Sequence, residues 1–155
     1  MAALKILIIP GSNRTGSYNA RLAGAFAREC AMQTERTDID ITRISLADFA
    51  LPLYDADDEA SQGIPSAAIN LKRLMALHQG VFIASPEYNS SVSPLVKNTI
   101  DWLTRIEERD ESMGHVFRTR VFAIGAASNG HFGGMRRLMA LRSILELGCK
   151  AHVVA

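Results

Sequence analysis

Residues 4–19 read LKILIIPGSNRTGSYN, an apolar run that ends at Pro10-Gly11 and passes into a polar loop. A short run rich in β-branched residues and closed by Pro-Gly is typical of a buried strand. An amphipathic pattern follows the loop and predicts a helix from about Ser17. Strand, polar loop and helix in this order indicate the first unit of an α/β fold.

The same alternation continues along the chain. Further strands are predicted at residues 38–44, 81–84, 120–126 and 152–155. Helices are predicted from Pro65 to Gly80, from Ser93-Pro94 onward, and from Met135 to Leu147. The acidic, aperiodic segment 46–63 is predicted to be a long loop.

Parallel strands need crossover connections, so this alternation favours a parallel sheet covered on both faces. We predict one α/β domain over residues 1–155, a flavodoxin-like three-layer sandwich with a five-stranded parallel sheet in the order 2-1-3-4-5. In that order the first and third strands lie side by side. The loops that leave them therefore meet at the carboxyl edge of the sheet, where open α/β sheets bind ligands.

Composition favours small-molecule chemistry. The net charge of +1 comes from 17 basic and 16 acidic residues without a long block of like charge, which argues against nucleic-acid or membrane partners. The first apolar run is too short to span a membrane and lacks a cleavage site, so we expect a cytoplasmic protein. Cys30 and Cys149 match no metal or disulfide motif, which predicts reduced thiols. The acidic residues 55–59 favour a solvated loop over a metal site.

The first loop has the residue types of a phosphate site. Glycines let backbone amides approach an anion, and serine, asparagine and arginine side chains add donors at a positive helix terminus. The residues concerned are Gly11, Ser12, Arg14, Gly16, Ser17 and Asn19. The alternative is an ordinary turn with Ser17 as the helix N-cap.

Two rival phosphate motifs do not match this loop. A P-loop requires Lys where this chain has Ser17, and the dinucleotide fingerprint requires a second glycine where it has Asn13. A monophosphate is therefore the favoured ligand.

Residues 85–91, SPEYNSS, form the second loop. Pro86 restrains the backbone, Tyr88 offers an aromatic body with a polar tip, and the residues that follow can form hydrogen bonds. Such a loop suits the polar edge of a flat ring, and with a phosphate cradle it suggests flavin mononucleotide (FMN) and redox chemistry. The alternatives are a surface turn for Tyr88, a structural role rather than general-base work for Glu87, and solvation rather than substrate contact for His131.

Three segments resemble the NADPH-dependent FMN reductase family, which includes quinone, azo and chromate reductases. They are the loop at 11–19, Ser85-Pro86-Glu87-Tyr88-Asn89, and SPLVKNTIDWL at 93–103. The resemblance covers essentially the whole chain. It implies a flavodoxin-like fold, non-covalent FMN, NADPH or NADH as co-substrate, and a homodimer or homotetramer.

The resemblance also implies the site residues. The FMN phosphate would be held by Ser12, Arg14, Ser17 and Asn19, with Tyr18 beside them; the ring would be lined by Pro86, Glu87, Tyr88, Asn89 and Ser90, and closed on its other side by Ser128, Asn129 and Gly130. No protein side chain is expected to act as a catalytic acid, base or metal ligand, because the flavin performs the chemistry.

Two further expectations follow from the resemblance. The helix that carries Trp102 often forms the family's dimer contact, so Trp102 belongs either to an interface or to the core. Relatives usually continue beyond the fifth strand into a last helix, whereas this sequence stops at Ala155. One sheet face is therefore expected to be uncovered near its edge.

The predicted function is a two-step transfer in which NAD(P)H delivers hydride to the flavin, leaves, and a quinone, free flavin, azo dye or similar small molecule takes the electrons. Arg136 and Arg137 either contact the extra phosphate of NADPH or are solvated. The alternatives are a flavodoxin-type electron carrier, which the net charge disfavours, and an FMN-binding regulatory protein.

Overall fold

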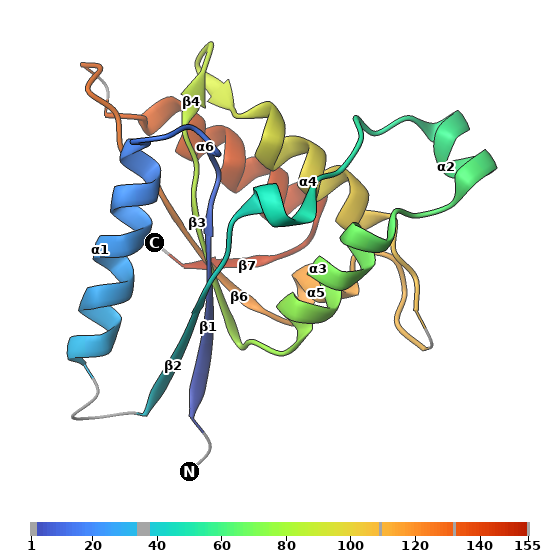
Figure 1. The fold of residues 1–155 in the computed structure, drawn as a ribbon, viewed down its shortest axis with the longest axis horizontal. Helices are drawn as coiled ribbons and strands as arrows, with labels where there is room; N and C mark the ends of the chain where they lie inside the picture. Colours follow the sequence, from blue (N-terminus) through green and yellow to red (C-terminus); the bar gives the residue numbers. More distant parts are fainter. Residues whose placement is uncertain (1–2, 34–37, 109, 132, 155) are drawn as a thin grey trace.

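The computed structural model describes residues 3–33, 38–108, 110–131 and 133–154. Its centre is a parallel five-stranded sheet in the order β2-β1-β3-β6-β7 (Figure 1). The strands are β1 (Leu4–Pro10), β2 (Ile39–Arg43), β3 (Gly80–Ala84), β6 (Val121–Gly125) and β7 (His152–Val154). Numbered along this sheet, that is the predicted order 2-1-3-4-5, which confirms the flavodoxin-like fold.

Helices cover the two sheet faces unequally (Figure 1). Among the described residues, helix α1 (Tyr18–Met32) is the only helix on one face. The other face carries α3 (Ser66–Ala76), α4 (Pro94–Thr104), α5 (His115–Arg118) and α6 (Met135–Ser143), which continues into a π-helical turn at Ile144–Gly148. The predicted last helix therefore changes its hydrogen-bond pattern four residues before Leu147.

The core has two parts, one on each face of the sheet. The larger cluster joins the sheet to α3, α4 and α6 and includes Leu7, Leu71, Ile100 and Leu141. The smaller cluster lies under α1 and comprises Ile8, Ala23, Phe82 and Ala84. Phe26 of α1 stacks on Phe82 with ring centroids 4.0 Å apart, which anchors the helix to β3.

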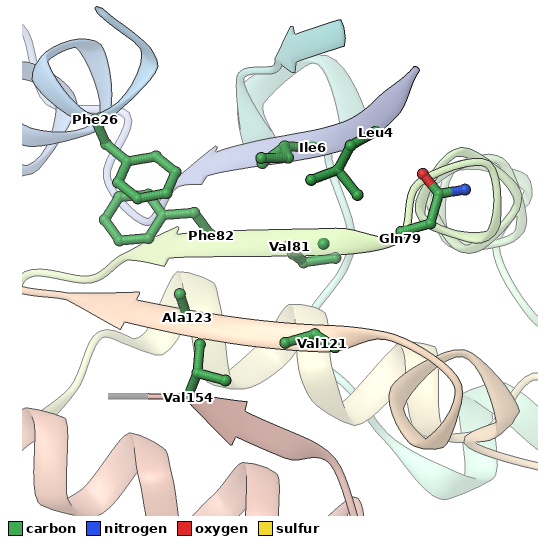
Figure 2. Close-up of a pocket in the computed structure, with 10 residues that line it drawn as sticks. Leu4, Ile6, Phe26, Gln79, Val81, Phe82, Val121, Ala123 and Val154 are labelled. Carbon is green, nitrogen blue, oxygen red and sulfur yellow. The ribbon is translucent and has the colours of Figure 1, made fainter. Parts of the chain in front are cut away.

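The α1 side of the sheet is bare toward β7. An apolar hollow of about 310 Å³ opens there (Figure 2). The side chains of Leu4, Val121 and Val154 line it and are 38%, 43% and 40% exposed.

The segment 46–63 is not a continuous loop, so that prediction was wrong. It contains a 3₁₀ turn at Leu46–Phe49 and helix α2 at Ala56–Gln62. The Asp55 side chain caps α2, since its Oδ1 accepts a hydrogen bond from the Asp57 N–H over 2.8 Å. Three further acidic residues occupy the first helical turn, where the helix dipole favours negative charge.

The second loop is a small β-hairpin, which the sequence did not predict. Strands β4 (Glu87–Tyr88) and β5 (Ser91–Val92) pair antiparallel. Asn89 and Ser90 form the turn at φ of 49° and 62°. Positive φ at both central residues is the geometry that two-residue hairpins prefer, and asparagine tolerates it better than most residues.

Trp102 belongs to the core. Its side chain is 1% exposed, and its Nε1–H donates to the carbonyl oxygen of Pro52 over 2.8 Å. The ring of Tyr54 packs edge-on against it at 5.1 Å. The core alternative is therefore confirmed, and no part of the indole remains exposed for a subunit contact. No helix in the described ranges is long and apolar enough to span a membrane.

Candidate functional site

Three loops line one cleft at the carboxyl edge of the sheet. They follow β1, β3 and β6, so the cleft lies at the point where the sheet order reverses. Its volume is about 420 Å³, within the range of small-molecule sites. The lining residues are Ser12, Arg14, Ser17, Tyr18, Asn19, Pro86, Glu87, Tyr88, Ala127, Ser128, Asn129 and Arg137.

The cleft thus brings together the predicted site residues from all three loops, with three exceptions. Asn89, Ser90 and Gly130 do not line it. Asn89 and Ser90 occupy the tip of the β4–β5 hairpin, and both are exposed. The hairpin turn therefore sets the direction of the preceding Glu87 and Tyr88 side chains, which do line the cleft.

The first loop is organised around the start of α1. Ser17 is the N-cap, and its Oγ accepts hydrogen bonds from the N–H groups of Asn19 and Ala20 over 3.2 and 3.4 Å. Ser12 Oγ accepts from the N–H of Arg14 over 3.3 Å. The Arg14 guanidinium is exposed at the mouth of the cleft, beside the positive end of the helix.

Gly11 fixes this loop against α4. Its N–H donates to the carbonyl oxygen of Ala84 over 2.7 Å, and its carbonyl oxygen accepts from Ser93 Oγ over 3.1 Å. A side chain at this position would place Cβ 2.5 Å from Val96 Cγ2. Glycine is therefore required here for close packing, and the loop cannot shift without moving α4.

The third loop is tied to the first through Asn19. The Asn19 Nδ2 donates to the carbonyl oxygen of Ala127 over 3.1 Å, and the Ala127 N–H donates back to Asn19 Oδ1 over 2.9 Å. Within the same loop Ser128 Oγ accepts from the N–H of Gly130 over 3.0 Å. Asn19 lies in the cleft as predicted, but both ends of its amide already bind the neighbouring loop.

Comparison with known proteins agrees with this architecture. The model of the NADPH-dependent FMN reductase family matches residues 4–155. The chain belongs to this family. It is an oxidoreductase of a family that depends on NAD(P)H and FMN.

Individual relatives support the assignment. The chain is 34% identical over 142 residues to a quinone reductase of Escherichia coli, covering 92% of this chain and 69% of the relative. It is 32% identical to an NAD(P)H-dependent FMN reductase of Pseudomonas aeruginosa, with the same coverage. A flavoenzyme NAD(P)H:(acceptor) oxidoreductase from Paracoccus denitrificans has the same fold, with a TM-score of 0.77 at 23% identity over 99% of this chain and 76% of that one.

Within this cleft, sequence reasoning missed the buried role of Arg137. Its side chain is 0% exposed, lines the cleft, and has no hydrogen-bond partner for Nε or Nη2 among the described residues. Burial lowers the pKa of its guanidinium, and the charge of Glu87 acts in the opposite direction. The solvated alternative for Arg137 was wrong, because its side chain is buried; a contact with the extra phosphate of NADPH stays a prediction. The only sign of this buried role in the sequence was a basic residue shortly after a pair of glycines.

Glu87 is the acidic residue of the cleft. Its Oε1 accepts from Arg136 Nη2 over 3.2 Å, while Oε2 is buried without a hydrogen-bond partner in the described part of the chain. His131 does not line the cleft. The lining therefore offers hydrogen-bond donors, an aromatic ring and fixed charges, but no paired acid and base.

The two thiols of the chain lie outside the cleft. Cys149 is buried, and desolvation raises its pKa to about 11. Cys30 is half-buried, and desolvation together with the charge of Glu29 also raises its pKa. Neither has the low pKa of a nucleophilic cysteine. Across the described residues, no group of three or more His, Cys, Asp or Glu side chains could hold a metal ion.

Proposed function

We propose that the protein binds FMN in the cleft and transfers electrons from NADPH or NADH to a flat acceptor such as a quinone, a free flavin or an azo compound. The observation that carries this proposal is the meeting of two different loops at the switch point. One loop offers hydroxyl groups, an arginine and a helix N-terminus, and the other offers a rigid hairpin with an aromatic side chain.

The phosphate would be held by the first loop. Arg14 supplies a charged fork, and Ser12 supplies a hydroxyl group. Ser17 caps α1 through its Oγ, which accepts from two backbone N–H groups, and its hydroxyl group can still donate to the phosphate. Tyr18 is 43% exposed and flanks the loop, and Asn19 holds the loop to its neighbour. These donors suit a monoester phosphate, which needs several hydrogen bonds and positive charge.

The ring would lie between the hairpin and the third loop. Pro86, Glu87 and Tyr88 form one wall, and Ser128 and Asn129 form the other. Asn89, Ser90 and Gly130 would act by shaping these loops. Two buried polar groups without hydrogen-bond partners among the described residues, on Glu87 and Arg137, face this part of the cleft. Orphaned buried polar atoms are costly, so their presence fits a polar ligand edge that completes them.

Bound FMN would supply the redox chemistry, with a hydride taken from NAD(P)H and an electron pair passed later to the acceptor. For a quinone the overall balance is NAD(P)H, a proton and the quinone in, NAD(P)⁺ and the hydroquinone out. The nicotinamide and the acceptor would both stack on the same flavin ring, so we infer that they occupy the cleft in turn, in a two-step, ping-pong order. The relatives, a quinone reductase and an FMN reductase, support a quinone or a flavin as acceptor.

Assembly and location complete the proposal. We place the protein in the cytoplasm as a homodimer or homotetramer, with its two thiols reduced. Exposed Met135 and Met139 on α6, 55% and 65% exposed, and Leu147, 79% exposed, offer apolar surface for a subunit contact. Sedimentation equilibrium of the purified chain tests the oligomeric state.

The decisive experiment is the absorbance spectrum of the purified protein after FMN is added and the excess removed, followed by anaerobic NADPH or NADH. Retained flavin that bleaches within seconds supports the proposal, and parallel double-reciprocal plots with a benzoquinone support the two-step order. Retained flavin that neither nicotinamide bleaches would indicate an electron carrier or a regulatory protein instead. Failure to retain FMN, with riboflavin and FAD also rejected, would overturn the assignment of the cleft.

A further inference from the structure

Arg137 is a fully buried cation at the floor of the cleft. It is 0% exposed, and two of its nitrogens, Nε and Nη2, have no hydrogen-bond partner within the described ranges. An arginine stays protonated even when buried, and a buried charge without partners costs several kcal/mol. The fold holds it there nonetheless, which indicates that something else completes its hydrogen bonds.

The position of Arg137 is on the ring side of the cleft rather than on the phosphate side. It lies in the first turn of α6, which begins after Gly134. A Cβ on Gly134 would collide with the Arg137 guanidinium and lie 2.9 Å from the Cβ of Ala126. Ala126 follows β6, whose last residue Gly125 accepts a hydrogen bond from the Ser85 N–H over 3.0 Å. The guanidinium therefore lies near the ends of β3 and β6, whose loops form the two walls assigned to the ring.

Gly134 makes this placement possible. Its φ of +94° is a conformation that side chains disfavour, and the missing Cβ leaves the space that the guanidinium fills. The backbone at the start of α6 is thus shaped to hold an arginine beneath the cleft.

The charges around Arg137 are few. Glu87 is the one acidic residue of the lining, and its Oε1 is already paired with Arg136, which is exposed. No ion pair between Arg137 and Glu87 is formed in the described structure. The positive charge of Arg137 is therefore only partly offset, and the low-dielectric floor of the cleft strengthens its effect on a bound group.

We propose that Arg137 contacts the polar edge of the bound flavin ring and favours reduced over oxidised FMN. This inference rests on the proposed function. Two-electron reduction adds negative charge to the ring at its N1 and carbonyl edge, and a fixed cation there stabilises the reduced form more than the neutral oxidised form. The residue acts by charge and hydrogen bonding and transfers no proton.

The test compares Arg137→Met with wild type in two measurements. The first is the dissociation constant of oxidised and of reduced FMN under anaerobic conditions, and the second is the reduction potential of the bound flavin against a reference dye. Arg137→Met is expected to weaken the binding of reduced FMN about tenfold more than the binding of oxidised FMN. For a two-electron couple that ratio corresponds to a potential about 30 mV lower.

Two further variants and one control sharpen the result. Arg137→Lys keeps the charge, so the reduction potential of its bound flavin should stay close to that of wild type. Arg137→Gln loses the charge, so its potential should be lower. Arg142→Met removes the same charge from the same helix, but from a residue paired with Glu146 outside the cleft, and should leave both constants unchanged. If Arg137→Met does not fold, as judged by circular dichroism, the difference between the Lys and Gln variants decides.

The outcomes separate this inference from the proposed function. Wild type that binds no FMN in either state would overturn both. Wild type that binds and turns over FMN, with a reduced-to-oxidised affinity ratio that is the same in Arg137→Met, would overturn the inference alone. Equal weakening of both states would also overturn it, because that result assigns Arg137 a purely structural role.

Discussion

The side-chain amide of Asn19 binds the backbone of Ala127 in both directions. Its Nδ2 donates to the Ala127 carbonyl oxygen over 3.1 Å, and the Ala127 N–H donates to its Oδ1 over 2.9 Å, across 108 positions of sequence. Asn19 is 3% exposed. The first turn of α1 and the loop after β6 are therefore held together, so two walls of the cleft keep a fixed spacing before any ligand arrives.

Asn19→Ala should loosen the third loop. Loss of two buried hydrogen bonds is expected to lower the free energy of unfolding by about 1–3 kcal/mol. FMN affinity should fall about tenfold, because the loop must then be ordered on binding. Urea unfolding and fluorescence titration measure the two effects. Asn19→Asp keeps the acceptor for the Ala127 N–H, so its stability and FMN affinity should lie between those of wild type and Asn19→Ala. Unchanged FMN affinity in Asn19→Ala would contradict the role given to this contact.

Arg14→Ala should weaken FMN selectively. A charge-assisted hydrogen bond to phosphate contributes about 1.5–3 kcal/mol, so the dissociation constant for FMN should rise roughly 10- to 100-fold. Riboflavin, which lacks the phosphate, should bind equally well to variant and wild type. The exposed Arg28 on α1 does not line the cleft and provides the matched control as Arg28→Ala. Equal losses of affinity for FMN and riboflavin would show that Arg14 does not contact the phosphate.

Gly11→Ala should push the first loop away from α4. The new Cβ would lie 2.5 Å from Val96 Cγ2 and 3.2 Å from the carbonyl oxygen of Ala84. Overpacking of this kind costs about 1–3 kcal/mol. In the double variant with Val96→Ala the cost should be less than the sum of the single costs, since the clash is relieved. Thermal unfolding of all four proteins gives the coupling, and strict additivity would argue against the clash.

Stability in acid should depend on Glu108. Hydrogen bonds from Arg73 and Lys72 hold the pKa of this carboxyl below its usual range. A lowered folded pKa contributes stability above the ordinary glutamate value of about 4.3, and the contribution is lost as pH falls through the lowered pKa. Glu108→Gln should therefore be less stable at neutral pH and approach wild type as pH falls through the lowered pKa. The exposed Glu107→Gln is the control, and a pH-independent difference for Glu108→Gln would count against the ion cluster.

The thiol of Cys149 should resist labelling. Its pKa is raised to about 11 by burial, so little thiolate exists at pH 8. A disulfide reagent such as dithionitrobenzoate should modify it only at the rate of unfolding, while the half-buried Cys30 reacts in the native state. Cys30→Ser isolates Cys149 for this measurement. Fast native labelling of that variant would mean that the site opens locally.

The sheet order and the meeting of the three loops could be predicted from sequence. Apolar runs closed by Pro-Gly or by polar loops mark the strands, and parallel strands place their carboxyl ends at one edge. The helix at 56–62 was not predicted because its stability comes from the Asp55 cap and the helix dipole rather than from an apolar stripe. The hairpin at 87–92 was not predicted because each of its strands is only two residues long.

The sequence could not predict which individual polar residues are buried. Arg136 and Arg137 are neighbours with the same chemistry, yet the first is exposed and the second is completely buried. The difference depends on the direction in which α6 leaves Gly134, and that direction is set by packing far away in the chain. For the same reason the sequence could place Asn19 at the cleft but not find its partner 108 positions later.

The apolar hollow beside β7 has a thermodynamic consequence for the folded chain. Leu4, Val121 and Val154 in its lining are 38%, 43% and 40% exposed, so part of this apolar surface is hydrated before unfolding begins. The heat capacity of unfolding comes mainly from newly hydrated apolar surface, so this chain gains less of it than a fully covered sheet would. Its stability should consequently vary more gently with temperature, and any molecule that fills the hollow would make the stability curve more sharply domed.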